Sequence, residues 1–347
     1  MTSLGVNVAD EAWDMVGSTR SKFAELVKRS EGFRVESLGK AALLVALEDE
    51  ATSLAMALEG GMSRGDAEDM INVGSCSTWT LGRLDSIAEE ARAIFIAGMA
   101  QNGEKKPPQA SDFPLAALEA INEVLFKRHG YKRPDRHHNG DPQNSLLPRV
   151  LEEGRGSPVL LGVLYMEIAR RIGLEVEGSP LSEGPNNDYF ILWPRRKLGP
   201  GGDNNIEMVV DAYEEGFLFK HDEILEMFDL KELQGASGLE ILGSMLASLQ
   251  DAHWAKAIEC RPEPAYLKRI SLEAAVDGQR GVLPEDARLD AALLAYHNGD
   301  LDTAWIELGA LEECLKDALM KGKLNLLMGR IRFLLDQETW TDDANVQ

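Results

Sequence analysis

The chain has 347 residues, a length that suits one large domain or two to three small ones. Its 36 Lys and Arg residues against 58 Asp and Glu residues give a net charge of −22, which argues against binding to nucleic acid or to anionic lipid surfaces. With 44% apolar and 27% charged residues, the composition is that of a folded globular chain and excludes a disordered one.

The sequence carries no targeting or membrane signal that we can recognise. The longest apolar run, Pro158–Met166, is too short for a bilayer, so no membrane insertion is expected. Acidic residues precede the first basic residue, Arg20, which fits neither a secretory signal nor a transit peptide. Three widely spaced cysteines indicate neither a disulfide framework nor a metal site. We therefore expect a reducing compartment: the cytoplasm, or a plastid interior if the chain is a processed form.

The first third of the chain has a helical pattern. Apolar residues recur at spacings of three and four around 23–27, 43–47 and 84–91, with breaks predicted at Gly60-Gly61 and Gly74-Ser75. A polar, Pro-rich segment at 101–114 is the best linker candidate. We expect an N-terminal helical region over residues 1–100.

The middle third mixes helices with strands. Helices are predicted at 115–129, at 146–151 and, strongly apolar, at 159–172. The only good strand candidates follow them, at Leu174–Val176, Tyr189–Trp193, Met208–Ala212 and Phe217–Phe219. These elements predict an α+β core over residues 113–235, a helix packed on a short antiparallel sheet, in a chain that is mostly helical.

The remaining region, 236–347, is predicted to be helical. Two segments, 289–297 and 301–315, flank the turn formers Asn298-Gly299-Asp300. This pair resembles one tetratricopeptide unit, although a generic helical hairpin would read the same, because several units are normally needed for a stable repeat array.

The sharpest local signal is at Ser157-Pro158. Serine is a preferred helix N-cap and proline is favoured at the next position, so a helix starts here with the positive end of its dipole at Ser157. Papain-like and transglutaminase-like folds place a catalytic cysteine at such a point. This chain has no cysteine there.

Four stretches of this chain resemble the SirB-type transglutaminase-like family. They are LEAINEVLFKRHG (118–130), DPQNSLLPRVLEEGRG (141–156), PVLLGVLYMEIARRIGLEVEG (158–178) and VDAYEEGFLF (210–219). The resemblance covers roughly residues 40 to 235 and implies a transglutaminase-like core. The family often carries tetratricopeptide-like helices after its core, which fits the hairpin at 289–315.

The resemblance implies a site that has lost its chemistry. A transglutaminase-like enzyme uses a helix-start Cys as nucleophile, a His as base and an Asp that orients the His. Here Pro158 stands at the nucleophile position, Tyr189 stands where the His would be, and only Asp211 matches. No catalytic residue is therefore predicted, and Ser157, Pro158, Tyr189 and Asp211 form a vestigial site.

Two classes of function stay open on the sequence. The first is a non-catalytic protein-binding scaffold or assembly subunit, in which Tyr131, Trp193, Trp254 and Trp305 are either interface anchors or core residues. The second is a hydrolase or acyltransferase that uses a remodelled cleft with Ser157 or Tyr189 in a new role. The first predicts a protein partner and no cofactor. A metal is not expected either, because the one His/Asp cluster, at His137-His138, has adjacent histidines that point in different directions.

Overall fold

The computed structural model describes residues 8–29, 38–59, 61, 63, 73–101, 108–135, 141–182, 188–195, 208–255, 292, 301–314, 321–322, 324–325, 327–333 and 335. The chain divides into two compact units, Met1–Ala265 and Tyr266–Gln347. His137-His138 and, apart from Ala292, the predicted helix at 289–297 lie outside the described residues.

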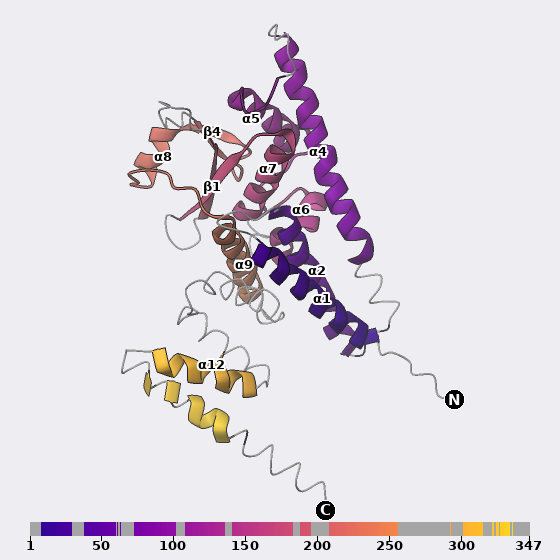
Figure 1. Ribbon diagram of the computed structural model, residues 1–347, viewed down its shortest axis with the longest axis vertical. Coiled ribbons are helices and arrows are strands. Elements are labelled where there is room, and N and C mark those ends of the chain that lie inside the picture. Colours follow the sequence, from indigo (N-terminus) through magenta and orange to yellow (C-terminus); the bar gives the residue numbers. More distant parts are fainter. Residues whose placement is uncertain are drawn as a thin grey trace, which may run out of the picture. The chain divides into compact units, whose positions relative to one another are not determined.

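Long helices form the first part of the first unit (Figure 1): α1 (Val8–Arg29), α2 (Leu38–Glu59) and α4 (Val73–Gln101). α1 packs on α2, and α2 and α4 contact each other and α7. On α4, Leu84, Ile87 and Ala91 recur at helical spacing and are fully buried, which is the pattern that predicted the helix. The break predicted at Gly74-Ser75 is wrong, because α4 already begins at Val73. In the first turn of a helix these residues interrupt no established hydrogen-bond ladder.

Shorter helices connect this part to the core. α5 (Pro114–Asn122) continues without a break into the π-helix η1 (Glu123–Arg128), and the 3-10 turn η3 (Pro142–Ser145) leads into α6 (Leu147–Glu153). The central helix α7 (Pro158–Ile172) is buried along most of its length. α8 (His221–Met227) and α9 (Gly238–Ala255) follow the sheet, and α9 packs on α7, α2, η3 and β1.

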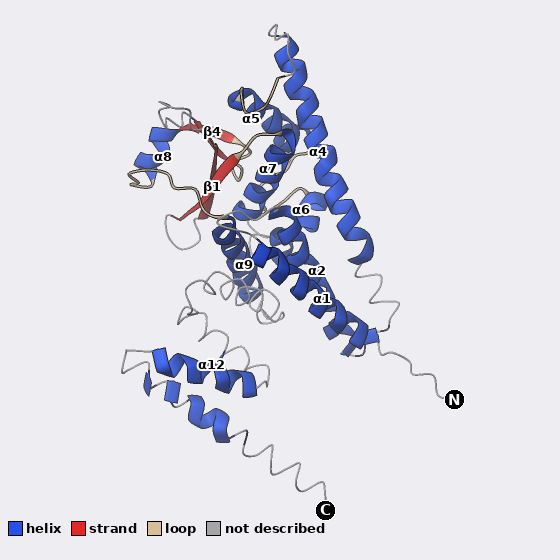
Figure 2. Ribbon diagram, viewed as in Figure 1, coloured by secondary structure: helices blue, strands red, loops and turns tan. Residues whose placement is uncertain are grey.

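A four-stranded antiparallel sheet lies beside α7, with its strands in chain order (Figure 2): β1 (Val176–Ser182), β2 (Asp188–Pro194), β3 (Met208–Asp211) and β4 (Phe217–Lys220). The first strand was expected at Leu174–Val176 but starts at Val176 and runs through Gly178 and Pro180. Two features explain the difference. β1 is an edge strand, where proline is tolerated. Glycine is needed at position 178 because a Cβ there would lie only 2.6 Å from the ring of Phe190.

The second unit contains the helix α12 (Leu301–Cys314), whose Leu301, Ala304, Leu308 and Leu311 share a core with Ala292, Leu324 and Ile331. Within the described residues of both units, every helix is too short or too polar to span a bilayer. The predicted fold class, α+β and mostly helical, is confirmed.

Candidate functional site

The start of α7 is formed as the sequence predicts. Ser157 is the N-cap, and its Oγ accepts a hydrogen bond of 3.4 Å from the Leu160 N–H, while Pro158 occupies the first turn. The Ser157 N–H donates to the carbonyl oxygen of Asn144 at 2.8 Å. The hydroxyl and the amide of Ser157 therefore both serve the local backbone structure.

The surroundings of Ser157 are filled. Ser157 is 8% exposed and Asn144 6%. A Cβ at the preceding residue, Gly156, would lie 3.0 Å from a methyl carbon of Val150 and 3.1 Å from Leu161. On the other side of Asn144, the hydroxyl of Ser145 lies 3.3 Å from that of Ser248 on α9. A substrate carbonyl would have to displace packed side chains to reach the hydroxyl of Ser157.

Tyr189 lies on the face of the sheet that points away from α7. Successive side chains of a strand alternate between the two faces. On β2, Phe190 faces α7, since a Cβ at Gly162 would lie 2.1 Å from its ring. Tyr189 belongs to the opposite set: it packs with Ile191 and Trp193, and its ring meets that of Phe228 edge to face, with centroids 5.2 Å apart. This aromatic packing gives the Tyr189 side chain a structural role in the sheet.

Asp211 lies on the same face of the sheet as Tyr189. It pairs directly with Ile191, and paired residues of antiparallel strands share a face. Its Oδ1 accepts hydrogen bonds from the N–H groups of Tyr213 at 2.8 Å and Glu214 at 3.3 Å, which fixes the turn between β3 and β4. Burial raises the pKa of Asp211, and the two N–H donors partly offset the rise.

The four residues singled out in the sequence therefore form two separate groups. Ser157 and Pro158 start α7 on one side of the sheet, whereas Tyr189 and Asp211 point to the other side. A nucleophile, a base and an orienting acid must lie within hydrogen-bond reach of one another, and this arrangement does not bring them there. Of the predicted aromatic anchors, Tyr131 and Trp193 are buried core residues, at 2% exposure each.

A partly buried polar network, which no sequence pattern predicted, links the central helix to the β3–β4 turn. The Tyr165 hydroxyl donates to Asn122 Oδ1 at 3.0 Å, and Asn122 Nδ2 donates to the Gly216 carbonyl at 2.8 Å. Gly216 has a positive φ of 78°, and a Cβ there would lie 2.5 Å from Asn122. Burial raises the pKa of Tyr165 well above its ordinary value, so its hydroxyl stays a donor.

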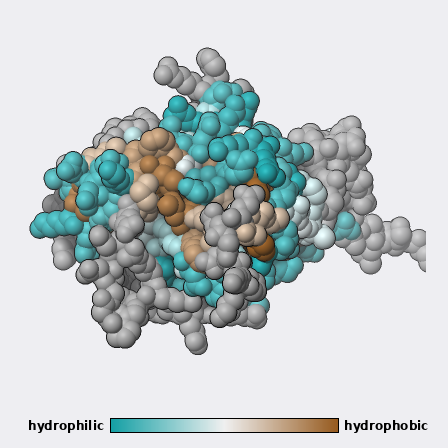
Figure 3. Space-filling view, turned by 90° about the horizontal axis from the view of Figure 1, so that it is seen from above, coloured by the Kyte–Doolittle hydropathy of each residue, from teal (hydrophilic) through white to brown (hydrophobic). Residues whose placement is uncertain are grey.

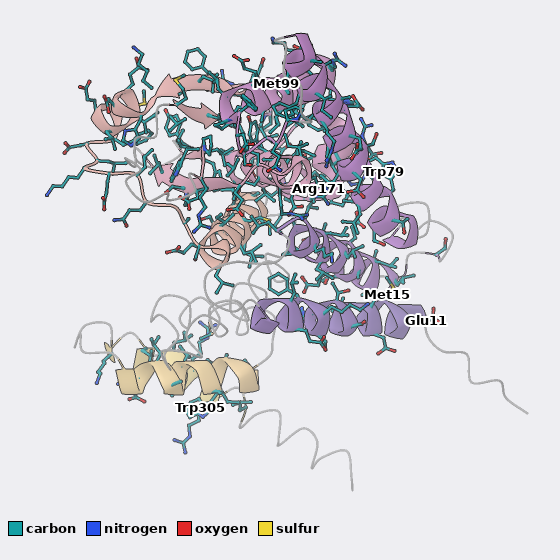
Figure 4. All side chains as sticks on the ribbon, turned by 45° about the horizontal axis from the view of Figure 1, so that its top comes forward. Glu11, Met15, Trp79, Met99, Arg171 and Trp305 are labelled. Carbon is teal, nitrogen blue, oxygen red and sulfur yellow. The ribbon has the colours of Figure 1, made fainter. Side chains whose placement is uncertain are left out.

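A second network ties α7 to α2 and α4. Glu167, 2% exposed, accepts hydrogen bonds from the Gly39 N–H at 3.0 Å and from Arg170 at 2.9 Å, and it pairs with Arg171. Arg171 Nε also donates to Asp85 Oδ1 on α4 at 2.8 Å, so this arginine connects α7 with α4 (Figure 4). A lone acid inside the apolar run of α7 was a usable signal for this network.

Among the pockets on the described part of the first unit are two that Ser157, Pro158, Tyr189 and Asp211 do not line. One, of about 630 Å³, lies between α7, β1 and the start of α9. The other, of about 760 Å³, we call the α4–α5 groove; α4, α5, η1 and the β3–β4 turn line it. In the described parts of the chain, no three His, Cys, Asp or Glu side chains gather closely enough to hold a metal ion.

Comparison with known proteins shows which family the chain matches. Residues 78–255 match the family described as the transglutaminase-like superfamily. Two curated proteins, each called UPF0162 protein, from Xylella fastidiosa strains Temecula1 and 9a5c, are each 39% identical to this chain over 71 residues. That stretch is 20% of this chain and 24% of each relative, so the match spans about a quarter of the relatives' length. No solved structure matches the chain significantly.

Proposed function

The chain belongs to the transglutaminase-like superfamily, and on that premise we propose that it is a non-catalytic protein-binding scaffold or assembly subunit built on a degenerate transglutaminase-like domain. Within the superfamily we assign it to the SirB type, on the resemblance of the stretches 118–130, 141–156, 158–178 and 210–219. We expect it to act through protein partners, without nucleic acid or cofactor, in the cytoplasm or a plastid interior.

The observation that carries this proposal is that the polar side chains of the predicted site already have structural roles. The nucleophile position holds Pro158, and the hydroxyl beside it, on Ser157, caps α7. Tyr189 and Asp211 lie on the far face of the sheet, in an aromatic contact and in a turn. Each group has a structural role in place, so acyl transfer would need new partners for all of them.

The proposal is tested by two measurements on the full chain. Incubation with amine donors and with glutamine or ester substrates is expected to give no turnover above that of Ser157→Ala and Asp211→Asn. Affinity purification from the native source is expected to return a protein in constant ratio to the chain. Turnover that either substitution abolishes would overturn the proposal in favour of a remodelled hydrolase or acyltransferase.

A further inference from the structure

The α4–α5 groove lies between two helical segments, and none of the four residues of the predicted site lines it. From α4, Phe95, Gly98 and Met99 line it; from α5 and η1, the lining residues include Ala116, Ala120, Glu123 and Lys127. Gly98 is exposed and Ala116 partly exposed, whereas Phe95, Met99 and Ala120 are buried, so the accessible part of this trough includes small residues of both helices. Met99 lies near the C-terminal end of α4 (Figure 4).

An aromatic side chain forms the far edge of the groove. Phe217, at the start of β4, lines it and is 57% exposed, with its ring held edge to face by Phe219 at 4.6 Å between centroids. Seen from the top of Figure 1, apolar surface lies exposed among hydrophilic areas (Figure 3). An exposed aromatic ring beside a groove is typical of an interface anchor.

The charges along the groove are mostly negative. Four carboxylates line it, from Glu119, Glu123, Glu214 and Glu215, against two cations, Lys127 and Arg128. Glu123 already pairs with Lys127 at 3.2 Å and with Arg128 at 3.6 Å, and Glu214 pairs with Arg133 at 2.6 Å. Glu119 and Glu215 make no ion pair with another described residue, so the rim offers two carboxylates to an incoming cation.

From this combination we propose that the α4–α5 groove binds an amphipathic helix of a partner protein, with apolar residues on one face and Lys or Arg beside them. The apolar face lies in the trough against Phe217, and the basic residues meet Glu119 and Glu215. This inference rests on the proposed function and names the surface that carries it.

A helix fits this site better than an added strand. β4 is an edge strand, but it is only four residues long. The backbone just before it is engaged by a side chain, since the Gly216 carbonyl accepts a hydrogen bond from Asn122. An extended peptide at that edge would find few free main-chain partners.

The groove can be blocked without disturbing the fold. Gly98 is exposed, and an added Cβ would meet nothing within 4 Å, so Gly98→Trp places a large ring in the trough. Gly82→Trp is the matched control, since Gly82 is also exposed on α4, has the same open space and lies outside the groove. As probe we use a fluorescein-labelled peptide of about 18 residues, five helical turns, with Leu on one face and Lys on the other. Its binding to the full chain is followed by fluorescence anisotropy.

We expect Gly98→Trp to weaken binding of this peptide about tenfold or more, and Gly82→Trp to leave it unchanged. Glu119→Lys with Glu215→Lys should weaken it about as much at low salt, whereas Glu226→Lys, an exposed charge reversal on α8, should have little effect. Absence of binding, equal binding of a peptide with scrambled Leu positions, or equal loss in the control variants would overturn the groove assignment.

Photo-crosslinking from residue 98 separates the possible occupants. With a benzophenone amino acid at position 98 of the full chain, irradiation in the native lysate is expected to capture a basic amphipathic segment of another protein, and position 82 should not capture it. A crosslink to a second copy, or to residues of this same chain, would contradict the proposal. A partner that co-purifies undiminished with Gly98→Trp would contradict binding at the groove but leave the proposed function intact. Catalytic turnover would contradict the proposed function itself.

Discussion

At the scale of single residues, Asp211 is explained by the turn that it holds. Asp211→Ala would leave the N–H groups of Tyr213 and Glu214 without their acceptor, and we expect a loss of about 1–2 kcal/mol in the free energy of unfolding. Asp211→Asn keeps an acceptor oxygen and removes a buried charge, so its cost at pH 7 should be below about 0.5 kcal/mol. Urea unfolding of both variants checks this. An equal loss in the two would show that the charge matters and the turn does not.

For Ser157 we predict a similar but smaller loss in the free energy of unfolding. Its cap bond to Leu160 is long, at 3.4 Å, so Ser157→Ala should cost about 0.5–1 kcal/mol. Ser157→Thr keeps the cap oxygen and should recover part of that loss. Thermal unfolding compares the two, and a Thr variant less stable than the Ala variant would indicate that packing outweighs the cap.

Glu50, on α2, is a carboxylate in an unfavourable place. Burial raises its pKa; nearby Arg149 partly offsets the rise, and Asp49 and Glu152 add to it. Its Oε2 is buried and accepts no hydrogen bond from the described residues. Because the folded state takes up this proton at a higher pH than the unfolded chain, ionised Glu50 destabilises the fold at pH 7, and the penalty disappears as the pH falls towards the ordinary value of about 4.3.

Glu50→Met should therefore stabilise the fold at pH 7 by up to about 1 kcal/mol, with a gain that shrinks at lower pH. The control is Glu153→Met, on the exposed side of α6, where little change is expected. Urea unfolding between pH 5 and 8 measures both. A gain that stays constant across this range would mean that the effect is apolar packing alone.

At the scale of elements, Glu167 joins α7 to α2 and, through Arg171, to α4. Burial alone would raise its pKa, but the Gly39 N–H and the charges of Arg170 and Arg171 hold the pKa below its ordinary value. Its ionised form thus stabilises the fold above the ordinary pKa, and this contribution is lost as the pH falls through the lowered value. Glu167→Gln should cost about 2–3 kcal/mol at pH 7.

The matched control for Glu167 is its neighbour in the same network. Asp85 pairs with Arg171 on α4 but is 69% exposed, so Asp85→Asn should cost less than about 1 kcal/mol. Urea unfolding at pH 7 separates the two. Equal costs would place the stabilising contact on α4 and contradict the role given to Glu167.

The same elements show what the sequence could and could not predict. Ser157-Pro158 announced the start of α7, because capping is a local interaction of a few residues. The sequence could not predict on which face of the sheet Tyr189 lies. Tyr189–Trp193 is apolar throughout, so its pattern does not distinguish the two faces of β2. The α4–α5 groove could not be predicted from the sequence either, since it depends on how separate helices and the β3–β4 turn pack together.

At the scale of the whole molecule, the charge of −22 has two consequences that oppose each other. It favours encounter with basic partners, and it destabilises the compact state through repulsion between like charges. Salt screens that repulsion, with a Debye length that falls from about 10 Å at 0.1 M to about 3 Å at 1 M. The buried pairs of Glu167 are screened much less than exposed charges, so the net effect of salt should be stabilising.

We therefore expect the urea midpoint of the full chain to rise between 0.05 and 0.5 M NaCl, while binding of the Leu–Lys peptide weakens over the same range. The two trends have one cause, since ions that screen repulsion within the chain also screen its attraction for a cation. Choline chloride in place of NaCl tests for specific sodium binding and should give the same rise. A midpoint that falls with salt would mean that exposed ion pairs outweigh the repulsion. Peptide binding that ignores salt would leave the acidic rim without a part in recognition.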